Sequence, residues 1–200
     1  MRHRDLVFVI IVTLFLNSCN ANLPLKISNE EKSTSTVINE SKNYRIDYIG
    51  QTTDGYDKYH YSVYNNNGGL MVEDEMKVKY PEFDYFTEDI LRMQVGAGNV
   101  TIYQFFDVKL NRISPRYNNP TLIENDKIVY MDYDGERLKL IVSDLFDKNK
   151  FYKEYLRDFS PIAAPYNALS SAKFIDSNKL QIAYLTGIDY KEITETIELN

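Results

Sequence analysis

Carboxylate side chains are the most abundant groups in this sequence that could do chemistry. The chain has 29 Asp and Glu residues, and the densest group is Glu73, Asp74 and Glu75, followed by Glu82, Asp84, Glu88 and Asp89. Two carboxylates on either side of a sugar could act as the acid and base of a glycoside hydrolase. Neighbouring residues of a strand point to opposite faces, however, and exposure to water is the ordinary state of Asp and Glu. We therefore expect a solvated surface here and assign no catalytic residue.

Histidine chemistry depends on one side chain once the first 18 residues are set aside. The chain has 2 His residues, and only His60 lies beyond residue 18. A Ser-His-Asp triad could be built around it, but the sequence has no Gly-x-Ser-x-Gly motif. Residues 59–61 indicate a strand in which His60 faces solvent or a neighbour. Zinc sites need several His or Cys ligands, which are absent, so we expect neither a metal nor a cofactor.

The run Asp132–Glu136 has the composition of a fragment of a calcium-binding loop. The remaining spaced oxygen ligands and the closing glutamate of such a loop are missing. Asp134 and Gly135 stand between two apolar runs, which is a strong signal for a β-hairpin. We expect a turn here and no calcium site.

The first 19 residues combine three features in a fixed order. Arg2 and Arg4 precede an apolar run over residues 6–16, and Leu16, Asn17, Ser18 and Cys19 follow. This order resembles the signal peptide and lipobox of bacterial lipoproteins, whereas the rest of the chain resembles no family. The apolar run of 11 residues is shorter than the roughly 20 needed to span a membrane, which also indicates an export signal. The alternative is an uncleaved membrane anchor with an incidental cysteine.

The resemblance implies a location. In bacterial lipoproteins the lipobox cysteine is acylated and becomes the first residue of the mature chain, and Cys19 takes that position here. A diacyl group and an N-linked acyl chain exceed the two signals that stable membrane attachment requires. Residue 20 is Asn and not Asp, which in the sorting pattern of enteric bacteria implies the outer membrane. We therefore expect an envelope protein that reaches the membrane through its lipid anchor, with no transmembrane helix in the mature part.

Loss of residues 1–18 changes the charge. The net charge shifts from −6 to −7 because Arg2, Arg4 and Asp5 are removed. Nucleic acids and anionic membrane surfaces need clustered Lys and Arg, so we expect no nucleic acid partner. An acidic surface suits solubility or a basic protein partner. With Cys19 acylated, no thiol remains for a disulfide, a metal site or a nucleophile.

Composition divides the mature chain into two parts. Residues 20–43 are rich in Asn, Ser, Thr, Glu and Lys and have no hydrophobic period, which is typical of disordered segments. We expect residues 19–43 to form the acylated cysteine and a flexible tether, with a packed strand around Leu25–Ile27 as the alternative. From Tyr44 onward short apolar and aromatic runs alternate with Gly, Asn and Asp. Residues 44–200 are long enough for a single β-rich domain with its own core.

Alternation with period two predicts β-strands in that part. One face of the clearest run consists of Val100, Ile102, Gln104 and Phe106. The pattern recurs at Leu138, Leu140 and Val142, and at Leu180, Ile182 and Tyr184.

Four modules follow from these runs. Strands over residues 44–49, 90–95, 127–133 and 172–175 each precede a turn and a second strand, and the turns are Thr53–Gly55, Gly96–Asn99, Asp134–Glu136 and Asp176–Asn178. Three of the second strands close with similar short sequences. These closing sequences start at Phe106, Phe146 and Ile188, and the starts are 40 and 42 residues apart. We predict a mainly β fold, an antiparallel meander of about four hairpin modules. A closed propeller, an open meander and a sandwich all agree with it.

Residues 151–159 fit two structures. Phe151, Tyr152, Tyr155, Leu156 and Phe159 have helical spacing, and Ser160 and Pro161 would end a helix. The high aromatic content favours a strand instead. Both a strand and one short helix near residues 150–159 remain as alternatives.

Tyrosine is unusually frequent, with 17 Tyr and 10 Phe but no Trp. Tyr has a large apolar body and a polar tip, which suits protein recognition and also the half-exposed face of a sheet. The candidate protein-binding residues are Tyr80, Phe83, Tyr85 and Phe86, which follow two lysines and are next to Pro81. A proline confines such a run to a sheet edge or a loop.

The function that agrees best with these features is binding. We expect a lipid-anchored envelope protein that recognises another protein, such as an inhibitor or immunity lipoprotein, and is not an enzyme. Two alternatives remain: a carboxylate-based glycan hydrolase and a structural component of the envelope.

Overall fold

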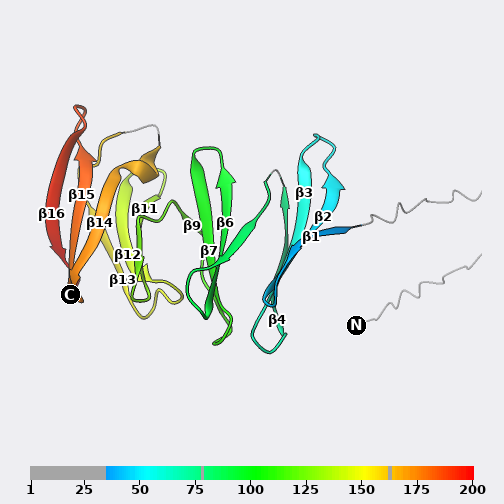
Figure 1. Ribbon diagram of the computed structural model, residues 1–200. Helices are drawn as coiled ribbons and strands as arrows, with labels where there is room; N and C mark the ends of the chain where they lie inside the picture. Colours follow the sequence, from blue (N-terminus) through cyan, green and yellow to red (C-terminus); the bar gives the residue numbers. More distant parts are fainter. Residues whose placement is uncertain (1–34, 78, 162–163) are drawn as a thin grey trace, which may run out of the picture. The chain divides into compact units, whose positions relative to one another are not determined.

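Antiparallel strands account for most of the structure (Figure 1). The computed structural model describes residues 35–77, 79–161 and 164–200. Cys19, the expected signal peptide and residues 19–34 of the expected tether lie outside the described residues, as does the alternative strand around Leu25–Ile27.

The first sheet has the order β1-β2-β3-β4. Its strands are β1 (Thr36–Glu40), β2 (Tyr44–Gln51), β3 (Asp57–Tyr64) and β4 (Leu70–Lys77). The prediction of a flexible tether through residue 43 is wrong for β1, which pairs with β2 and places Val37 opposite Asp47. Val37 and Ile38 are β-branched residues, which favour a strand. They are not part of an extended hydrophobic pattern, so the sequence did not reveal this strand.

The second sheet follows the order β5-β6-β7-β8, and β9 also pairs with β7. Its strands are β5 (Glu82–Tyr85), β6 (Ile90–Ala97), β7 (Val100–Asp107), β8 (Arg112–Ile113) and β9 (Tyr117–Asn118). The third sheet has the order β10-β11-β12-β13, with β10 (Leu122–Glu124), β11 (Lys127–Tyr133), β12 (Leu138–Asp144) and β13 (Tyr152–Leu156).

The fourth sheet has three strands in the order β14-β15-β16. They are β14 (Leu169–Asp176), β15 (Lys179–Thr186) and β16 (Lys191–Glu198), and the short 3-10 helix η1 (Pro165–Asn167) precedes them. The mainly β fold and the four hairpin modules are thus confirmed. Each predicted turn joins two paired strands, namely β2 to β3, β6 to β7, β11 to β12 and β14 to β15.

The alternative of a short helix near residues 150–159 is wrong, because β13 occupies Tyr152–Leu156. Along this strand exposed residues alternate with half-buried ones, so period two decides its structure. β13 pairs with the edge of β12 that β11 leaves free, and this pairing places Leu140 opposite Tyr155. Tyr155 then packs against the core between the third and fourth sheets. The apparent helical spacing arose from aromatic residues present on both faces of the strand.

Three apolar cores join successive sheets. The core between the first and second sheets contains Ile46, Tyr61, Val63, Leu91, Met93 and Phe106. The core between the second and third sheets contains Phe105, Tyr117, Ile128, Tyr130, Ile141 and Leu145. The core between the third and fourth sheets contains Val129, Met131, Leu140, Val142, Leu180, Ile182 and Tyr184.

The two middle sheets therefore bury both faces. Phe105 and Phe106 are neighbours on β7 and enter different cores, as successive residues of a strand must. Figure 1 shows the sheets following one another in chain order, from the blue first sheet to the red end of the fourth. Among the described residues each core connects only successive sheets, so the fold is an open array of meanders and not a closed propeller.

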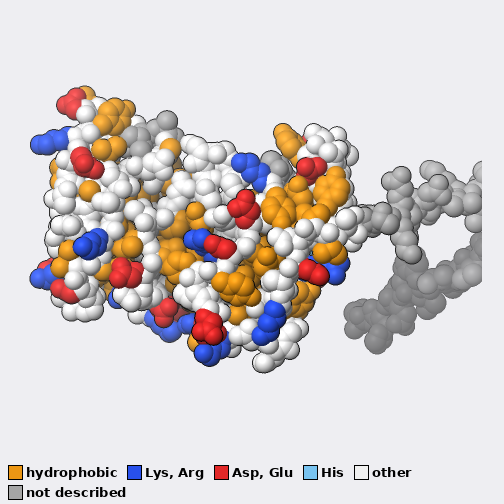
Figure 2. Space-filling model, viewed as in Figure 1, with side chains coloured by type: hydrophobic (Ala, Val, Ile, Leu, Met, Phe, Trp, Pro, Cys, Tyr) orange, Lys and Arg blue, Asp and Glu red, His pale blue; other side chains and the backbone are white. Residues whose placement is uncertain are grey.

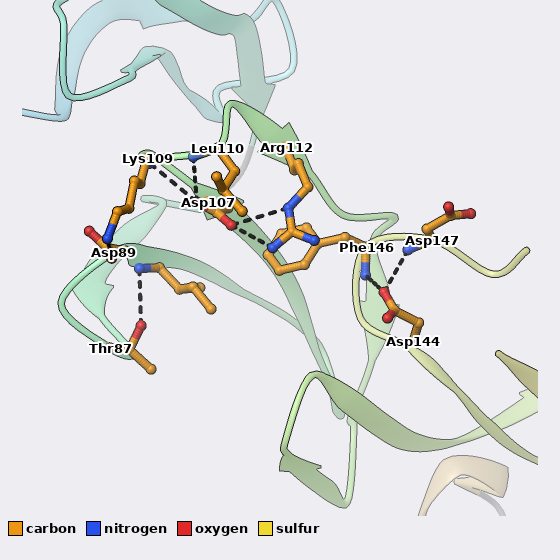
Figure 3. Close-up of polar contacts among 10 residues, drawn as sticks. Thr87, Asp89, Asp107, Lys109, Leu110, Arg112, Asp144, Phe146 and Asp147 are labelled. Atoms are coloured by element: carbon orange, nitrogen blue, oxygen red, sulfur yellow. Dashed lines mark hydrogen bonds and ion pairs between the residues drawn. The ribbon is translucent and has the colours of Figure 1, made fainter. Parts of the chain in front are cut away.

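Aspartates hold the loops that follow the second long strand of the middle sheets (Figure 3). Asp107 Oδ1 accepts hydrogen bonds from the backbone N–H groups of Lys109 (3.2 Å) and Leu110 (2.8 Å). Asp144 Oδ1 accepts them from the N–H groups of Phe146 and Asp147, both at 2.9 Å. The predicted repeat aligns Asp107 with Asp147, but the aspartate that ends the equivalent strand of the third sheet is Asp144.

In the part of the chain that the structure describes, no helix is long and apolar enough to cross a membrane.

Candidate functional site

A groove beside the third sheet has a volume of about 760 Å³. We call it the third-sheet groove. One wall is formed by the last residue of β11, the turn and the first residue of β12. The other wall is formed by the last residue of β13 and the segment that follows it. Its lining residues are Tyr133, Glu136, Arg137, Leu138, Leu156, Arg157, Asp158, Phe159, Ser160 and Pro161.

The hairpin turn at Asp134 and Gly135 fixes the first wall. Gly135 adopts a φ of +94°, which the turn requires and glycine tolerates. Asp134 Oδ1 accepts hydrogen bonds from the N–H groups of Arg137 (2.9 Å) and Glu136 (3.0 Å), and Lys139 Nζ lies 3.0 Å from Oδ2. The bonds from Arg137 and Lys139 hold the pKa of the Asp134 carboxyl well below its usual range. The Asp134 carboxylate therefore stabilises the turn. It belongs to the segment that has the composition of a fragment of a calcium-binding loop.

The second wall is fastened to the fourth sheet. Arg157 Nε donates to Glu195 Oε1 at 2.5 Å, and Arg157 Nη1 donates to the carbonyl oxygen of Leu156 at 2.8 Å. The Phe159 ring packs edge-on against Tyr184, with the ring centroids 5.2 Å apart. Ser160 Oγ donates to the carbonyl oxygen of Gly187 at 2.7 Å. The contacts with Tyr184, Gly187 and Glu195 hold this wall against the fourth sheet.

The groove combines apolar surface with charge. Tyr133 and Leu156 are 49% and 45% exposed, although each is a large apolar residue. Glu136, Arg137 and Asp158 have no ion-pair partner among the described residues, whereas Arg157 is paired with Glu195. Exposed apolar groups beside unpaired charges are typical of surfaces that bind an amphipathic segment. Ser160 uses its hydroxyl proton in the bond to Gly187, so the groove offers no activated nucleophile.

The four predicted protein-binding aromatics do not share one role. Phe83 stacks on Tyr44 with the ring centroids 4.8 Å apart and packs against the first core, as Tyr80 also does. Phe86, 37% exposed, packs edge-on against the buried Phe105 at 5.7 Å. Tyr85 is 47% exposed, but its hydroxyl donates to Oδ1 of the buried Asn43 at 2.7 Å. Most of this aromatic surface thus stabilises the fold.

The acidic run of β4 is divided between two faces of the first sheet. Glu73 and Glu75 lie on the outward face, where Glu73 Oε1 is 2.9 Å from His60 Nε2 and Glu75 Oε2 is 2.6 Å from Lys58 Nζ. Asp74 lies on the opposite face and pairs with Arg116 at 2.7 Å. Burial raises the pKa of Asp74, but hydrogen bonds from Arg116 and other donors outweigh it and lower the value. The three carboxylates therefore lie on two faces of the sheet, and each is close to a different basic side chain.

His60 lies between carboxylates on the outward face of the first sheet. Its Nδ1 is 3.8 Å from Asp47 Oδ2, and its Nε2 faces Glu73. Within the described residues no hydrogen bond joins it to a Ser or Thr hydroxyl, and no group of three or more His, Cys, Asp or Glu could hold a metal ion. The other acids, Glu82, Asp84 and Asp89, contact Gln94, Arg92 and Lys109.

Sequence reasoning did not identify the third-sheet groove. Two sequence features mark the segments that line the groove. The Asp-Gly turn indicated a hairpin and Pro161 indicated a loop, but neither indicated that a groove lies between them. Comparison with known proteins gives no further guide to the site. No protein-family model matches the chain, and the search of curated proteins finds no match.

Proposed function

We propose that this chain is a lipid-anchored protein of the bacterial envelope whose third-sheet groove binds a segment of another, basic protein. Such a role suits an inhibitor or immunity lipoprotein that acts on a toxin or a cell-wall enzyme. The observation that carries the binding proposal is the pair Tyr133 and Leu156, two exposed apolar residues from different strands on either side of one groove.

Charge supports a basic partner. The chain has a net charge of −6, and the carboxylates of Glu136 and Asp158 have no ion-pair partner within the described residues. A lysine or arginine of the partner could pair with them, while an apolar side chain packs between Tyr133 and Leu156. Because the charged groups lie at the rim, we expect binding to weaken as salt rises.

The anchor is supported by the order of Arg2, the apolar run and Cys19. Cells that express the chain should incorporate labelled palmitate into it, and Cys19→Ala should abolish the label. Fractionation of the membranes should place the protein in the outer membrane. Label that persists in Cys19→Ala would contradict acylation at this residue.

A photo-reactive amino acid at position 156 of the full-length protein tests the groove in living cells. Leu110, 61% exposed on a loop of the second sheet, provides the matched control position. We expect one basic protein to cross-link at position 156 and not at position 110. The purified partner should then bind about tenfold more weakly to Tyr133→Ser than to the unchanged protein.

The same cross-linked products at both positions would contradict the groove as the binding site. So would an affinity that Tyr133→Ser leaves unchanged, since Tyr133 is exposed and its replacement should cost little stability.

A further inference from the structure

A second groove lies on the second sheet and differs in chemistry from the first. It has a volume of about 510 Å³ and is lined by Lys79, Tyr80, Glu82, Gln94, Gly96, Thr101 and Tyr103. We call it the second-sheet groove. Apart from Gly96, which has no side chain, every lining residue ends in a charged or hydrogen-bonding group, and the two tyrosines add aromatic rings. An apolar ligand is therefore a poor match for it.

The floor of this groove is built by strand pairing. Glu82 lies opposite Gln94, and Gln94 lies opposite Tyr103, in the registers of β5 with β6 and of β6 with β7. Gln94 Nε2 donates to Glu82 Oε2 at 2.7 Å. That bond leaves the other Glu82 oxygen and the Gln94 carbonyl oxygen able to accept hydrogen bonds from a ligand.

Gly96 and Lys79 shape one end. A Cβ atom at position 96 would lie 3.2 Å from Lys79 Nζ and 3.7 Å from its Cδ, so the lysine lies directly over the glycine backbone. Lys79 has no ion-pair partner among the described residues, which leaves its ammonium group able to donate. The Thr101 hydroxyl can both donate and accept.

A row of tyrosines leads to the groove. The rings of Tyr48 and Tyr59 are 5.9 Å apart, and those of Tyr59 and Tyr80 are 5.7 Å apart. Tyr80 ends this row and also lines the groove. All three rings are half-buried and therefore retain exposed surface. Figure 2 shows hydrophobic side chains, tyrosine included, gathered over β2 and β3 in this view.

This combination of groups matches one class of ligand. A sugar ring has hydroxyl groups that donate and accept, and these suit Glu82, Gln94, Lys79 and Thr101. It also has an apolar face of C–H groups, which packs against aromatic rings such as Tyr80 and Tyr103. A nucleic acid is excluded by the single lysine and the carboxylate of the lining.

We propose that the second-sheet groove binds a glycan chain. One sugar unit occupies the groove between Tyr80 and Tyr103, and the following units lie along Tyr59 and Tyr48. The absence of a side chain at Gly96 allows the ligand and Lys79 to approach the sheet backbone closely. The site binds without cleaving, because Glu82 is the one carboxylate among its lining residues and glycoside hydrolysis uses two.

Affinity electrophoresis of the full-length protein in detergent provides the test. Native gels would contain soluble β-glucan, dextran or xylan, and a parallel sedimentation assay would use purified peptidoglycan sacculi. We expect retardation by at least one soluble polysaccharide or sedimentation with the sacculi, and the two arms separate external glycans from the cell wall. Tyr80→Ala and Gln94→Ala should each weaken binding about tenfold.

Matched variants keep the test independent of folding. Gln181→Ala removes an exposed glutamine from the fourth sheet and should leave glycan binding unchanged. Gly96→Ala adds one methyl group beneath Lys79, which can move aside at little cost to the fold, and should reduce binding. Thermal unfolding of each variant identifies any that is destabilised.

Two results would overturn the proposal. One is the lack of any interaction with the four probes, and the other is an interaction that Gln94→Ala and Gly96→Ala do not change. The outcome is separable from that for the third-sheet groove, because Tyr133→Ser should leave glycan binding intact and Gln94→Ala should leave cross-linking at position 156 intact.

Discussion

The guanidinium group of Arg112 lies over the ring of Phe146, with its Cζ atom 4.5 Å from the ring centroid (Figure 3). The same group donates to Asp107 Oδ2 from Nη2 at 2.6 Å and from Nε at 3.1 Å. Arg112 thus connects the carboxylate that ends β7 to the loop that follows β12. A cation above an aromatic face and a charge-assisted bond act together at this junction of the second and third sheets.

Replacement of Arg112 should therefore be costly. Arg112→Gln leaves the buried Asp107 carboxylate without its counter-charge, and we expect the free energy of unfolding to fall by about 2–4 kcal/mol. Lys109→Gln removes the exposed pair with Asp89 and should cost much less, because solvent screens this pair. Urea unfolding measures both. Equal losses in the two variants would contradict a special role for Arg112.

Stability should decline in acid through a small set of aspartates. Hydrogen bonds from Arg45 lower the pKa of Asp47. For Asp107, burial raises the pKa, but hydrogen bonds from the Leu110 N–H and from Arg112 outweigh it and lower the value. A carboxyl group whose pKa is lower in the folded state stabilises the fold above its unfolded pKa of about 4, and this contribution is lost as the pH falls through the folded value.

We accordingly expect a nearly constant free energy of unfolding from pH 7 to about pH 5 and a steep loss below about pH 4. Urea titrations at a series of pH values measure this profile. Asp107→Asn should lower the stability at pH 7 and make the loss in acid shallower. A profile as steep as that of the unchanged protein would show that Asp107 does not contribute.

Tyr85 should prove to be a structural residue. Its hydroxyl donates to Oδ1 of Asn43, which is only 2% exposed, while Asn43 Nδ2 donates to the carbonyl oxygen of Tyr64 at 2.9 Å. Tyr85→Phe removes one partner of a buried amide and should cost about 1–3 kcal/mol of stability. Circular dichroism melting measures the loss. Cross-linking at position 156 should be unaffected, in contrast to the sequence-based expectation that Tyr85 contacts a partner.

Ser143 should tolerate loss of its hydroxyl. The residue is fully buried, and its Oγ atom forms no hydrogen bond of ordinary geometry among the described residues, although it lies close to the Tyr117 and Tyr130 hydroxyls. Burial of an unpaired hydroxyl costs free energy, so Ser143→Ala should leave stability unchanged or raise it by about 1 kcal/mol. A fall of more than about 1 kcal/mol would show that the hydroxyl is in fact satisfied. Ser114→Ala is the matched control, since Ser114 Oγ accepts the Phe105 N–H at 2.9 Å and its loss should destabilise.

The hairpins were predictable because their information is local. Period-two alternation and turn residues lie within a few positions of each other, so the strand over residues 127–133 could be placed to the residue. The edges were harder. β1 was missed since five residues are too few to establish a period, and β13 was ambiguous because aromatics occur on both of its faces.

The binding surfaces depend on contacts that no local pattern records. One wall of the third-sheet groove is fastened by Arg157, which donates to Glu195, 38 residues further along the chain. The aromatic residues from Tyr80 to Phe86 could be recognised as unusual, but the sequence does not tell which neighbouring sheet covers each ring. Phe83 faces a core in which Tyr44 of another sheet stacks on it.

The placement of consecutive strands in the same sheet, and of consecutive sheets against a shared core, has a consequence for folding. Strand pairing joins almost only consecutive strands, so strand contacts are more local than in an all-β fold with crossover connections, and folding should be correspondingly faster. Each completed sheet presents an apolar face on which the next can assemble, as in repeat proteins. Among the described residues β16 pairs with β15 alone, and it carries Glu192, Glu195 and Glu198, charges that discourage edge-to-edge pairing with a strand of another molecule.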